Sequence, residues 1–134
     1  MNSPKRRTHV SNGNKSSPSE LPSEDHEQML FVQWFRRTYP GVLIYAIPNG
    51  GARHPAVAAK MKATGTVKGV PDLHVPAWSL WIEMKRQKGG TVAPEQKDQM
   101  AYLQSIGHTC LVCAGNEIAQ QMTRAFVAQR EGVD

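Results

Sequence analysis

Two carboxylates and a lysine draw attention in the middle of the chain, because they lie close together in an otherwise basic stretch. Between Arg53 and Lys88 there are seven basic residues and only two acidic ones, Asp72 and Glu83. Lys85 follows Glu83 by two positions. Two carboxylates held together repel each other unless a cation lies between them. The combination therefore predicts a site for a hard divalent cation, most simply Mg²⁺, which Mn²⁺ can replace.

Strand periodicity explains how these three residues come together. The segment 80–85 has the pattern of a strand, in which Glu83 and Lys85 share one face at a distance of roughly 6–7 Å. A second short strand is predicted over residues 70–75, with Asp72 near its start. If the two strands pair as a hairpin, Asp72 is brought toward Glu83.

A divalent cation at this place suits the cleavage of a phosphodiester. Such an ion polarises the scissile phosphate, acidifies the attacking water and stabilises the leaving oxygen. The ammonium of Lys85 has two uses in that reaction: it orients the water, or it neutralises charge that grows in the transition state. The sequence does not choose between these two roles.

Glu27 is predicted to be a third acidic member of the site. It has the helical spacing of the apolar residues Leu30, Phe31 and Trp34, so it faces inward. An inward glutamate is costly unless it is paired or bound to a metal. The alternative is a surface glutamate in the first turn, favoured by the helix dipole. With Asp72 and the Glu-x-Lys element present, we favour the functional interpretation.

The elements that position these residues follow the order α, β, α, β, β, α, β, α. Spacing, caps and turn signals predict helices over residues 23–38, 55–64, 94–106 and 116–130, and strands over 42–47, 70–75, 80–85 and 109–113. Ser23 and Asn116 are the expected N-caps of the first and last helices. Such an order is typical of an α/β fold with a mixed sheet flanked by helices. Residues 1–22, rich in Ser, Asn, Pro and Lys, are predicted to be a disordered basic and polar tail, and residues 23–134 one folded domain.

Composition restricts the class of protein. The chain of 134 residues is 40% hydrophobic with a formal net charge of +5, which suits one globular domain with a polyanionic partner. Its apolar runs are far shorter than the roughly 18–20 residues that cross a bilayer, and no apolar segment follows the basic N-terminus. We therefore expect a soluble cytoplasmic protein without membrane contact. Cys110 and Cys113 are expected to be reduced thiols, because a zinc site needs four ligands and no second pair exists.

The motifs resemble those of a known nuclease superfamily. Pro71-Asp72 followed by Glu83-Met84-Lys85 resembles the PD-(D/E)XK signature. Several further pieces resemble one branch of it, the virus-type replication-repair nuclease (VRR-NUC) family: residues 69–73, 81–85, 94–96 and 47–51, and the leading helix with Glu27. Together these pieces cover residues 25–130, nearly the whole predicted domain.

This resemblance implies a fold, an activity and a set of site residues. The fold would be the restriction-endonuclease-like α/β core. Asp72 and Glu83 would bind the metal together with the backbone carbonyl of Met84, and Lys85 would serve the water. Glu27 would complete the acidic cluster, and Gln96 would be a supporting polar residue. Standalone members resemble phage and bacterial Holliday-junction resolvases, which act as homodimers on branched DNA.

A nuclease also needs groups that hold phosphates. Six residues are candidates for DNA contact, namely Asn49, Arg53, Lys60, Lys62, Lys68 and Arg86. The alternative for the basic residues is a solvated basic face, and for Asn49 a plain turn residue, since Asn-Gly is a common turn pair.

The prediction is thus a magnesium-dependent endodeoxyribonuclease for branched DNA such as four-way junctions. One alternative is a nuclease of the same fold that acts on flaps, single strands or a restriction-type site. Another is a catalytically silent DNA-binding module, against which the intact Asp72, Glu83 and Lys85 argue. A homodimer is expected because a symmetric junction needs two nicks; Trp78 and part of the last helix are apolar candidates for its seam.

Overall fold

A computed structural model describes residues 20–48 and 54–132, and its elements follow the predicted order. In chain order they are α1 (Glu24–Thr38), β1 (Tyr45–Ala46), α2 (Pro55–Ala63), β2 (Leu73–Val75), a 3₁₀ turn η1 (Pro76–Trp78), β3 (Leu80–Lys85), α3 (Pro94–Ser105), β4 (Thr109–Ala114) and α4 (Asn116–Gly132). All but the last three residues of the predicted tail lie outside the described residues. None of the described helices is long and apolar enough to cross a membrane.

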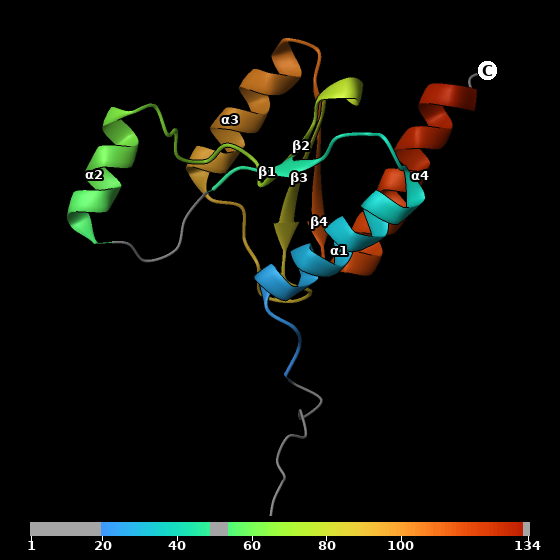
Figure 1. The fold of residues 1–134 in the computed structure, drawn as a ribbon, viewed down its shortest axis with the longest axis horizontal. Helices are drawn as coiled ribbons and strands as arrows, with labels where there is room; N and C mark the ends of the chain where they lie inside the picture. The colour runs from blue at the N-terminus through green and yellow to red at the C-terminus, as the bar shows by residue number, and fades with distance from the viewer. Residues whose placement is uncertain (1–19, 49–53, 133–134) are drawn as a thin grey trace, which may run out of the picture.

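The four strands form one mixed sheet in the order β1-β2-β3-β4 (Figure 1). β1 and β2 are antiparallel, β2 and β3 form the predicted antiparallel hairpin, and β3 and β4 are parallel. Leu73 pairs with Ile82, so the position before β2, Asp72, comes opposite Glu83. The sheet therefore brings the two carboxylates to the same place, as the strand pattern predicted.

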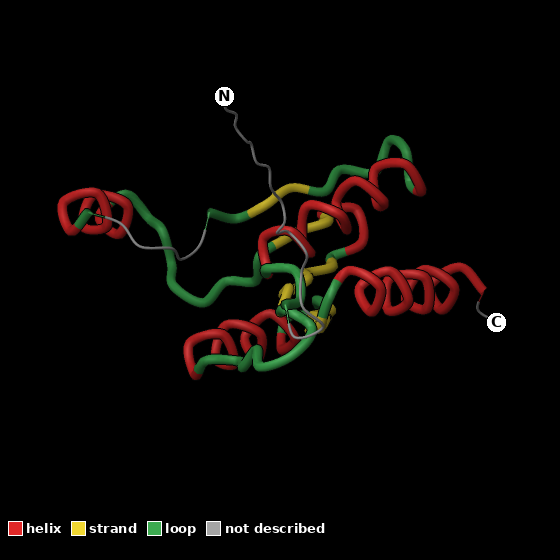
Figure 2. Tube along the Cα trace, turned by 90° about the horizontal axis from the view of Figure 1, so that it is seen from below, coloured by secondary structure: helices red, strands yellow, loops and turns green. Residues whose placement is uncertain are grey.

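The two faces of the sheet have different covers. Side chains of Leu73, Leu80, Ile82 and Met84 form the core with α1 and α4, where Phe31, Phe35 and Ala119 are fully buried. On the opposite face of β4, the Cys110 thiol lies 3.9 Å from the Met100 carbonyl oxygen of α3. Figures 1 and 2 show α1 and α4 on one side of the sheet and α3 on the other. Glu83 and Lys85 belong to the α3 side.

Of the two helix N-caps predicted from the sequence, the structure confirms one and contradicts the other. The Ser23 hydroxyl accepts a hydrogen bond from the His26 N–H at 3.1 Å, so it caps α1 as expected. Asn116 was expected to cap α4, but it lies inside the first turn of that helix. Its N–H is satisfied instead by Glu27, a residue from the other end of the chain.

The first strand is shorter than predicted, with two residues instead of six. Gly41 has a φ of 88°, and the Val42 N–H donates to the Tyr39 carbonyl at 3.1 Å, so this part of the chain is still turning after α1. Ile44 is buried in the core, whereas the neighbouring β2 offers only three residues for pairing. The pairing at this edge of the sheet is therefore short, because β1 and β2 are both short strands.

The connection between β2 and β3 is a 3₁₀ turn rather than a two-residue hairpin loop. Ser79 ends it in the left-handed region at φ 48°. The turn presents Trp78 to the helices, where its ring lies 5.5 Å from Phe35 and 5.2 Å from Tyr39, between ring centroids. Trp78 therefore packs within its own chain, which weakens its candidacy for a dimer seam.

Candidate active site

The Asp72 carboxylate is held in place by the strand opposite it. Its Oδ2 accepts a hydrogen bond from the Met84 N–H at 2.8 Å. Because the N–H and C=O of one strand residue point to the same side of the strand, the Met84 carbonyl also points toward Asp72. Both predicted oxygen ligands thus face the same space beyond the start of β2.

The approach of Asp72 to the site depends on a glycine. Gly69 has a φ of 93°, and a Cβ on it would lie only 2.5 Å from the Glu95 carbonyl oxygen. The chain that leads to Asp72 therefore passes directly against the first turn of α3. This contact brings the Asp72 segment and the helix that carries Gln96 together.

Glu83 is the most constrained group of the site. Its residue is 1% exposed, and its Oε2 receives hydrogen bonds from Lys85 Nζ at 3.2 Å and Gln96 Nε2 at 2.5 Å. Its Oε1 is buried and has no hydrogen-bond partner among the described residues. An unsatisfied buried carboxylate oxygen is costly and calls for an additional partner.

The charge on Glu83 is destabilised by its surroundings. Burial, followed by the neighbouring Asp72 carboxylate, raises the pKa of Glu83 from 4.5 to about 7, although the hydrogen bond and charge of Lys85 work in the opposite direction. The Asp72–Glu83 pair therefore holds more negative charge than Lys85 alone compensates. A divalent cation next to Glu83 Oε1 would relieve both the repulsion and the missing contact.

Lys85 and Gln96 form a fixed pair beside Glu83. Gln96 Oε1 accepts from Lys85 Nζ at 3.0 Å and from the Ala93 N–H at 2.9 Å, while its Nε2 donates to Glu83. The first turn of α3 thereby holds the Gln96 amide in one orientation. Lys85 is 9% exposed and uses two of its three donors on Glu83 and Gln96. Gln96 therefore lies beside both Glu83 and Lys85, and its supporting role in the site stays a prediction.

Glu27 faces inward, as its helical spacing predicted, but its partners differ from those expected. It is 2% exposed; Oε1 accepts from the Asn116 N–H and Oε2 from Gln87 Nε2, each at 2.7 Å. The carboxylate thus lies at the N-terminus of α4, where the helix dipole favours it. Within residues 20–48 and 54–132, no three His, Cys, Asp or Glu side chains gather closely enough to hold a metal. The structure therefore does not place Glu27 in an acidic cluster with Asp72 and Glu83.

Glu24 is the acidic residue of α1 that interacts electrostatically with Asp72 and Glu83. Burial raises its pKa first, and the Asp72 charge raises it further, whereas Lys85 lowers it. Glu24 therefore lies within electrostatic reach of both residues. The sequence held a signal for it, because Glu24 precedes Glu27 by three positions and shares its side of the helix. Glu27, which has the better apolar spacing, lies one turn further along α1.

The candidates for DNA contact are spread over several elements. Asn49 and Arg53 lie outside the described residues. Lys60 and Lys62 lie on α2, a helix with no buried residue, which Figures 1 and 2 show standing apart from the sheet. Lys68 pairs with Glu95 at 3.5 Å across largely exposed side chains, which contributes little stability.

Arg86 has a local partner of its own. Its Nε donates to the Lys88 carbonyl at 2.9 Å and its Nη2 to the Gly89 carbonyl at 3.1 Å. The side chain thus orders the loop that follows β3, directly after Lys85. Arg86 is exposed and follows Lys85 directly in the sequence. Its guanidinium group is engaged in hydrogen bonds to the loop.

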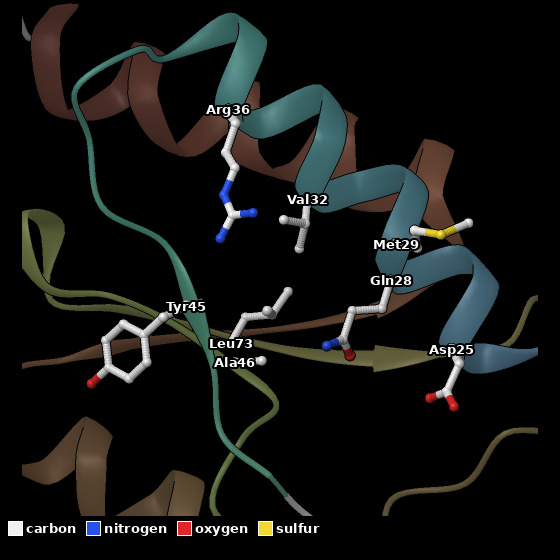
Figure 3. Close-up of a pocket in the computed structure, with 8 residues that line it drawn as sticks. All are labelled: Asp25, Gln28, Met29, Val32, Arg36, Tyr45, Ala46 and Leu73. Carbon is white, nitrogen blue, oxygen red and sulfur yellow. The ribbon is translucent and has the colours of Figure 1, made fainter.

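A groove of about 340 Å³ lies between α1 and the edge of the sheet, away from the carboxylate pair. Gln28 and Arg36 point into it from α1, and Leu73 and Ala46 lie on its sheet side (Figure 3). Neither Asp72, Glu83 nor Lys85 lines this groove. It is therefore separate from the candidate active site.

Comparisons with known proteins identify the fold. No protein-family model matches the sequence, and no curated protein matches it. Among solved structures, one similar chain is described as a "VRR_NUC domain protein", with 24% sequence identity and a TM-score of 0.68. The match covers 81% of this chain and 90% of the other. The chain has the fold of a VRR_NUC domain protein.

This VRR_NUC fold confirms the predicted α/β class, with a mixed sheet flanked by helices. It also agrees with the resemblance found in the sequence. A structural match at 24% sequence identity shows the fold alone. In the VRR_NUC fold of this chain, the β2–β3 hairpin supplies the two carboxylates and the lysine, and the start of α3 supplies Gln96. A fold of this kind does not by itself determine an activity, which depends on such side chains.

Proposed function

We propose that this chain is a metal-dependent endodeoxyribonuclease of the VRR-NUC family that hydrolyses DNA phosphodiester bonds. One observation carries the proposal: beside a second carboxylate, Glu83 has a buried oxygen with no partner in the part of the chain that the structure describes, while Lys85 and Gln96 contact its other oxygen. A purely structural ion pair would have no use for the second carboxylate or for the unsatisfied oxygen. The donor set consists of hard oxygens, which suits Mg²⁺ or Mn²⁺.

The ligands of the ion would be Asp72, Glu83 and the Met84 carbonyl. When bound, the ion supplies Lewis-acid activation of the phosphate and of the attacking water. Lys85 is held with two donors engaged, and its third donor is left for the substrate phosphate. An ammonium group fixed at this position would stabilise negative charge that develops on the phosphate, and this favours the electrostatic role of Lys85 over orientation of the water. Gln96 fixes the directions of both Glu83 and Lys85.

We propose branched DNA, such as a four-way junction, as the substrate, in the cytoplasm of a bacterial or phage-infected cell. The +5 charge and the exposed lysines of α2 support a polyanionic partner. A homodimer would place two sites on the two strands of a symmetric junction. With Trp78 packed internally, the exposed Ile118 of α4 is the remaining candidate for the seam.

The test is incubation of the full chain with four-way, flap and linear duplex DNA, each with Mg²⁺ or with EDTA. We expect cleavage only with the metal, strongest on the four-way junction. The Asp72→Asn variant should bind DNA but not cut it, and Glu95→Gln, an exposed change on α3, should cut normally. Binding without cleavage of any substrate in Mg²⁺ and in Mn²⁺ would identify a catalytically silent DNA-binding module instead.

A further inference from the structure

Four aromatic rings form a continuous row on the face of the sheet that carries Glu83 and Lys85. His74 stacks on Trp81 with centroids 3.8 Å apart and an interplanar angle of 10°. Tyr45 meets His74 edge to face at 5.3 Å, and Trp81 Nε1 donates to His108 Nδ1 at 2.8 Å. Figure 3 shows the Tyr45 ring pointing away from α1, on the opposite side from Leu73. The row thus crosses the sheet from the edge strand β1 to the start of β4.

Strand geometry places this row beside the candidate active site. His74 follows Asp72 by two residues, and Trp81 precedes Glu83 by two residues, with each pair on one face of the sheet. Two residues of a strand span roughly 6–7 Å. A nucleotide whose phosphate lies at the carboxylate pair therefore has its neighbouring base within reach of the row.

Tyr45 is the end of the row that a ligand can reach. It lies on the edge strand and is 39% exposed, whereas His74, Trp81 and His108 are each partly covered. Its hydroxyl shares a hydrogen bond of 2.7 Å with His74 Nδ1, which fixes the direction of the ring. An exposed aromatic ring held still in this way loses little further freedom when it binds.

We propose that the Tyr45 ring is a stacking platform for an unpaired base next to the phosphodiester that the carboxylate pair would cut. This inference rests on the proposed function, because it takes the ligand to be a nucleic acid. The positive charge of the chain suits the phosphates, and an aromatic ring suits the face of any base. Inside a continuous duplex both faces of a base are covered by its neighbours. The platform therefore favours DNA with an unstacked base next to the cut, as in flaps and loops and at the centre of a four-way junction, where the stack of bases is interrupted.

Sheet stability is the other use of such a row, because aromatic pairs across strands stabilise sheets. That explanation accounts for His74 and Trp81, which lie on adjacent paired strands. It accounts less well for Tyr45, whose strand has only two residues and whose ring remains partly exposed. The two explanations differ in what they predict for DNA with and without unpaired bases.

The test measures binding in EDTA, so that cleavage does not interfere, with DNA carrying 2-aminopurine in a single-stranded segment or in a continuous duplex. Tyr45→Leu removes the ring, Tyr45→Phe keeps it, and Tyr102→Leu changes an exposed tyrosine on α3 as a control. We expect Tyr45→Leu to weaken binding of the single-stranded probe by roughly 5- to 150-fold and to abolish quenching of the 2-aminopurine. Duplex binding and the salt dependence should change little, as should all binding by Tyr45→Phe and Tyr102→Leu.

Equal affinity and equal quenching for Tyr45→Leu and the parent would overturn the proposal, as would failure of the chain to bind single-stranded DNA. If Tyr45→Leu does not fold, photocrosslinking of 5-iodouracil DNA to the parent chain replaces it. A crosslink mapped to Tyr45 supports the platform, and a crosslink confined to other residues refutes it. If DNA binding depends on Tyr45 but the chain cuts no DNA, the proposed nuclease activity is refuted and the proposed stacking platform is supported. If the chain cuts DNA with a metal and neither binding nor cleavage depends on Tyr45, the stacking platform is refuted and the nuclease activity is supported.

Discussion

Glu83 should make the metal-free protein less stable as the pH rises. Its pKa lies at about 7 in the folded chain, against 4.5 for an ordinary glutamate, because of burial and the Asp72 charge. The folded state therefore holds the Glu83 proton more tightly than the unfolded state does. The resulting loss of stability is absent below about pH 4.5, grows as the pH rises toward 7, and is complete above it. Its full size is about 3 kcal/mol of unfolding free energy.

Glu83→Gln should remove this pH dependence. The amide keeps the volume of the side chain and an oxygen for Lys85, but it does not titrate. Its unfolding free energy also differs from that of the parent by an amount that does not depend on pH, since the substitution changes the group at Oε1, an atom with no hydrogen-bond partner among the described residues. The difference in unfolding free energy between variant and parent should nevertheless move in favour of the variant by about 2 to 3 kcal/mol between pH 5 and pH 8.

The measurement is urea unfolding of both proteins in EDTA at several pH values from 5 to 8. Glu95→Gln is the matched control, because Glu95 is exposed, and its own backbone hydrogen bond and Lys68 lower its pKa. The control should follow the parent. If Glu83→Gln also follows the parent across this range, Glu83 is ionised in the folded protein at low pH, and the argument for an uncompensated carboxylate pair is refuted.

Four further predictions concern the proposed nuclease. In the parent, Mg²⁺ should raise the unfolding free energy more at pH 8 than at pH 6, because below pH 7 the metal must displace a proton; calorimetry with and without Mg²⁺ checks this. Lys85→Ala should slow cleavage by roughly 10²- to 10³-fold at saturating DNA in a single-turnover assay, and an unchanged rate would mean that the site is misplaced. Changing Lys60 and Lys62 together to Ala should flatten the salt dependence of DNA binding without lowering the saturated rate, and an unchanged slope would show that α2 faces elsewhere. Light scattering at micromolar concentration should give about twice 14.8 kDa, and a monomer that makes paired nicks in one binding event would contradict the dimer.

The central hairpin could be predicted because its signals are local. Alternation within residues 80–85 fixed the faces, and the bounds of β3 agree with the prediction residue for residue. Pairing with the short strand before it then brought Asp72 opposite Glu83. The cap at Ser23 and the start of α3 at Pro94 could also be predicted from a few adjacent residues. In each case the physical cause lies within one turn or one strand of the residue concerned.

The partners of Glu27 could not be predicted in this way. Its two hydrogen bonds reach Gln87 and Asn116, which are 60 and 89 positions further along the chain. Helical spacing correctly showed that the side chain faces inward, but it contains no information on which distant group it meets. The same limitation explains the error at Asn116, which was expected to cap α4 but lies in its first turn, with its N–H bonded to the distant Glu27.

Glu24 and Glu27, one turn apart on α1, thus have different surroundings. The position of Glu24 depends on the contacts that Glu27 makes. Glu27 ties the first turn of α1 to the N-terminus of α4 and to Gln87, which follows Lys85 by only two positions. Gly115 is part of this contact, since a Cβ on it would lie 2.8 Å from the Gln87 side chain. With that turn fixed, Glu24 is held where it senses Asp72 and Lys85. A glutamate that faces inward needs a partner, but that partner need not be a metal. For Glu27 the structure shows Gln87 and the Asn116 N–H as the partners.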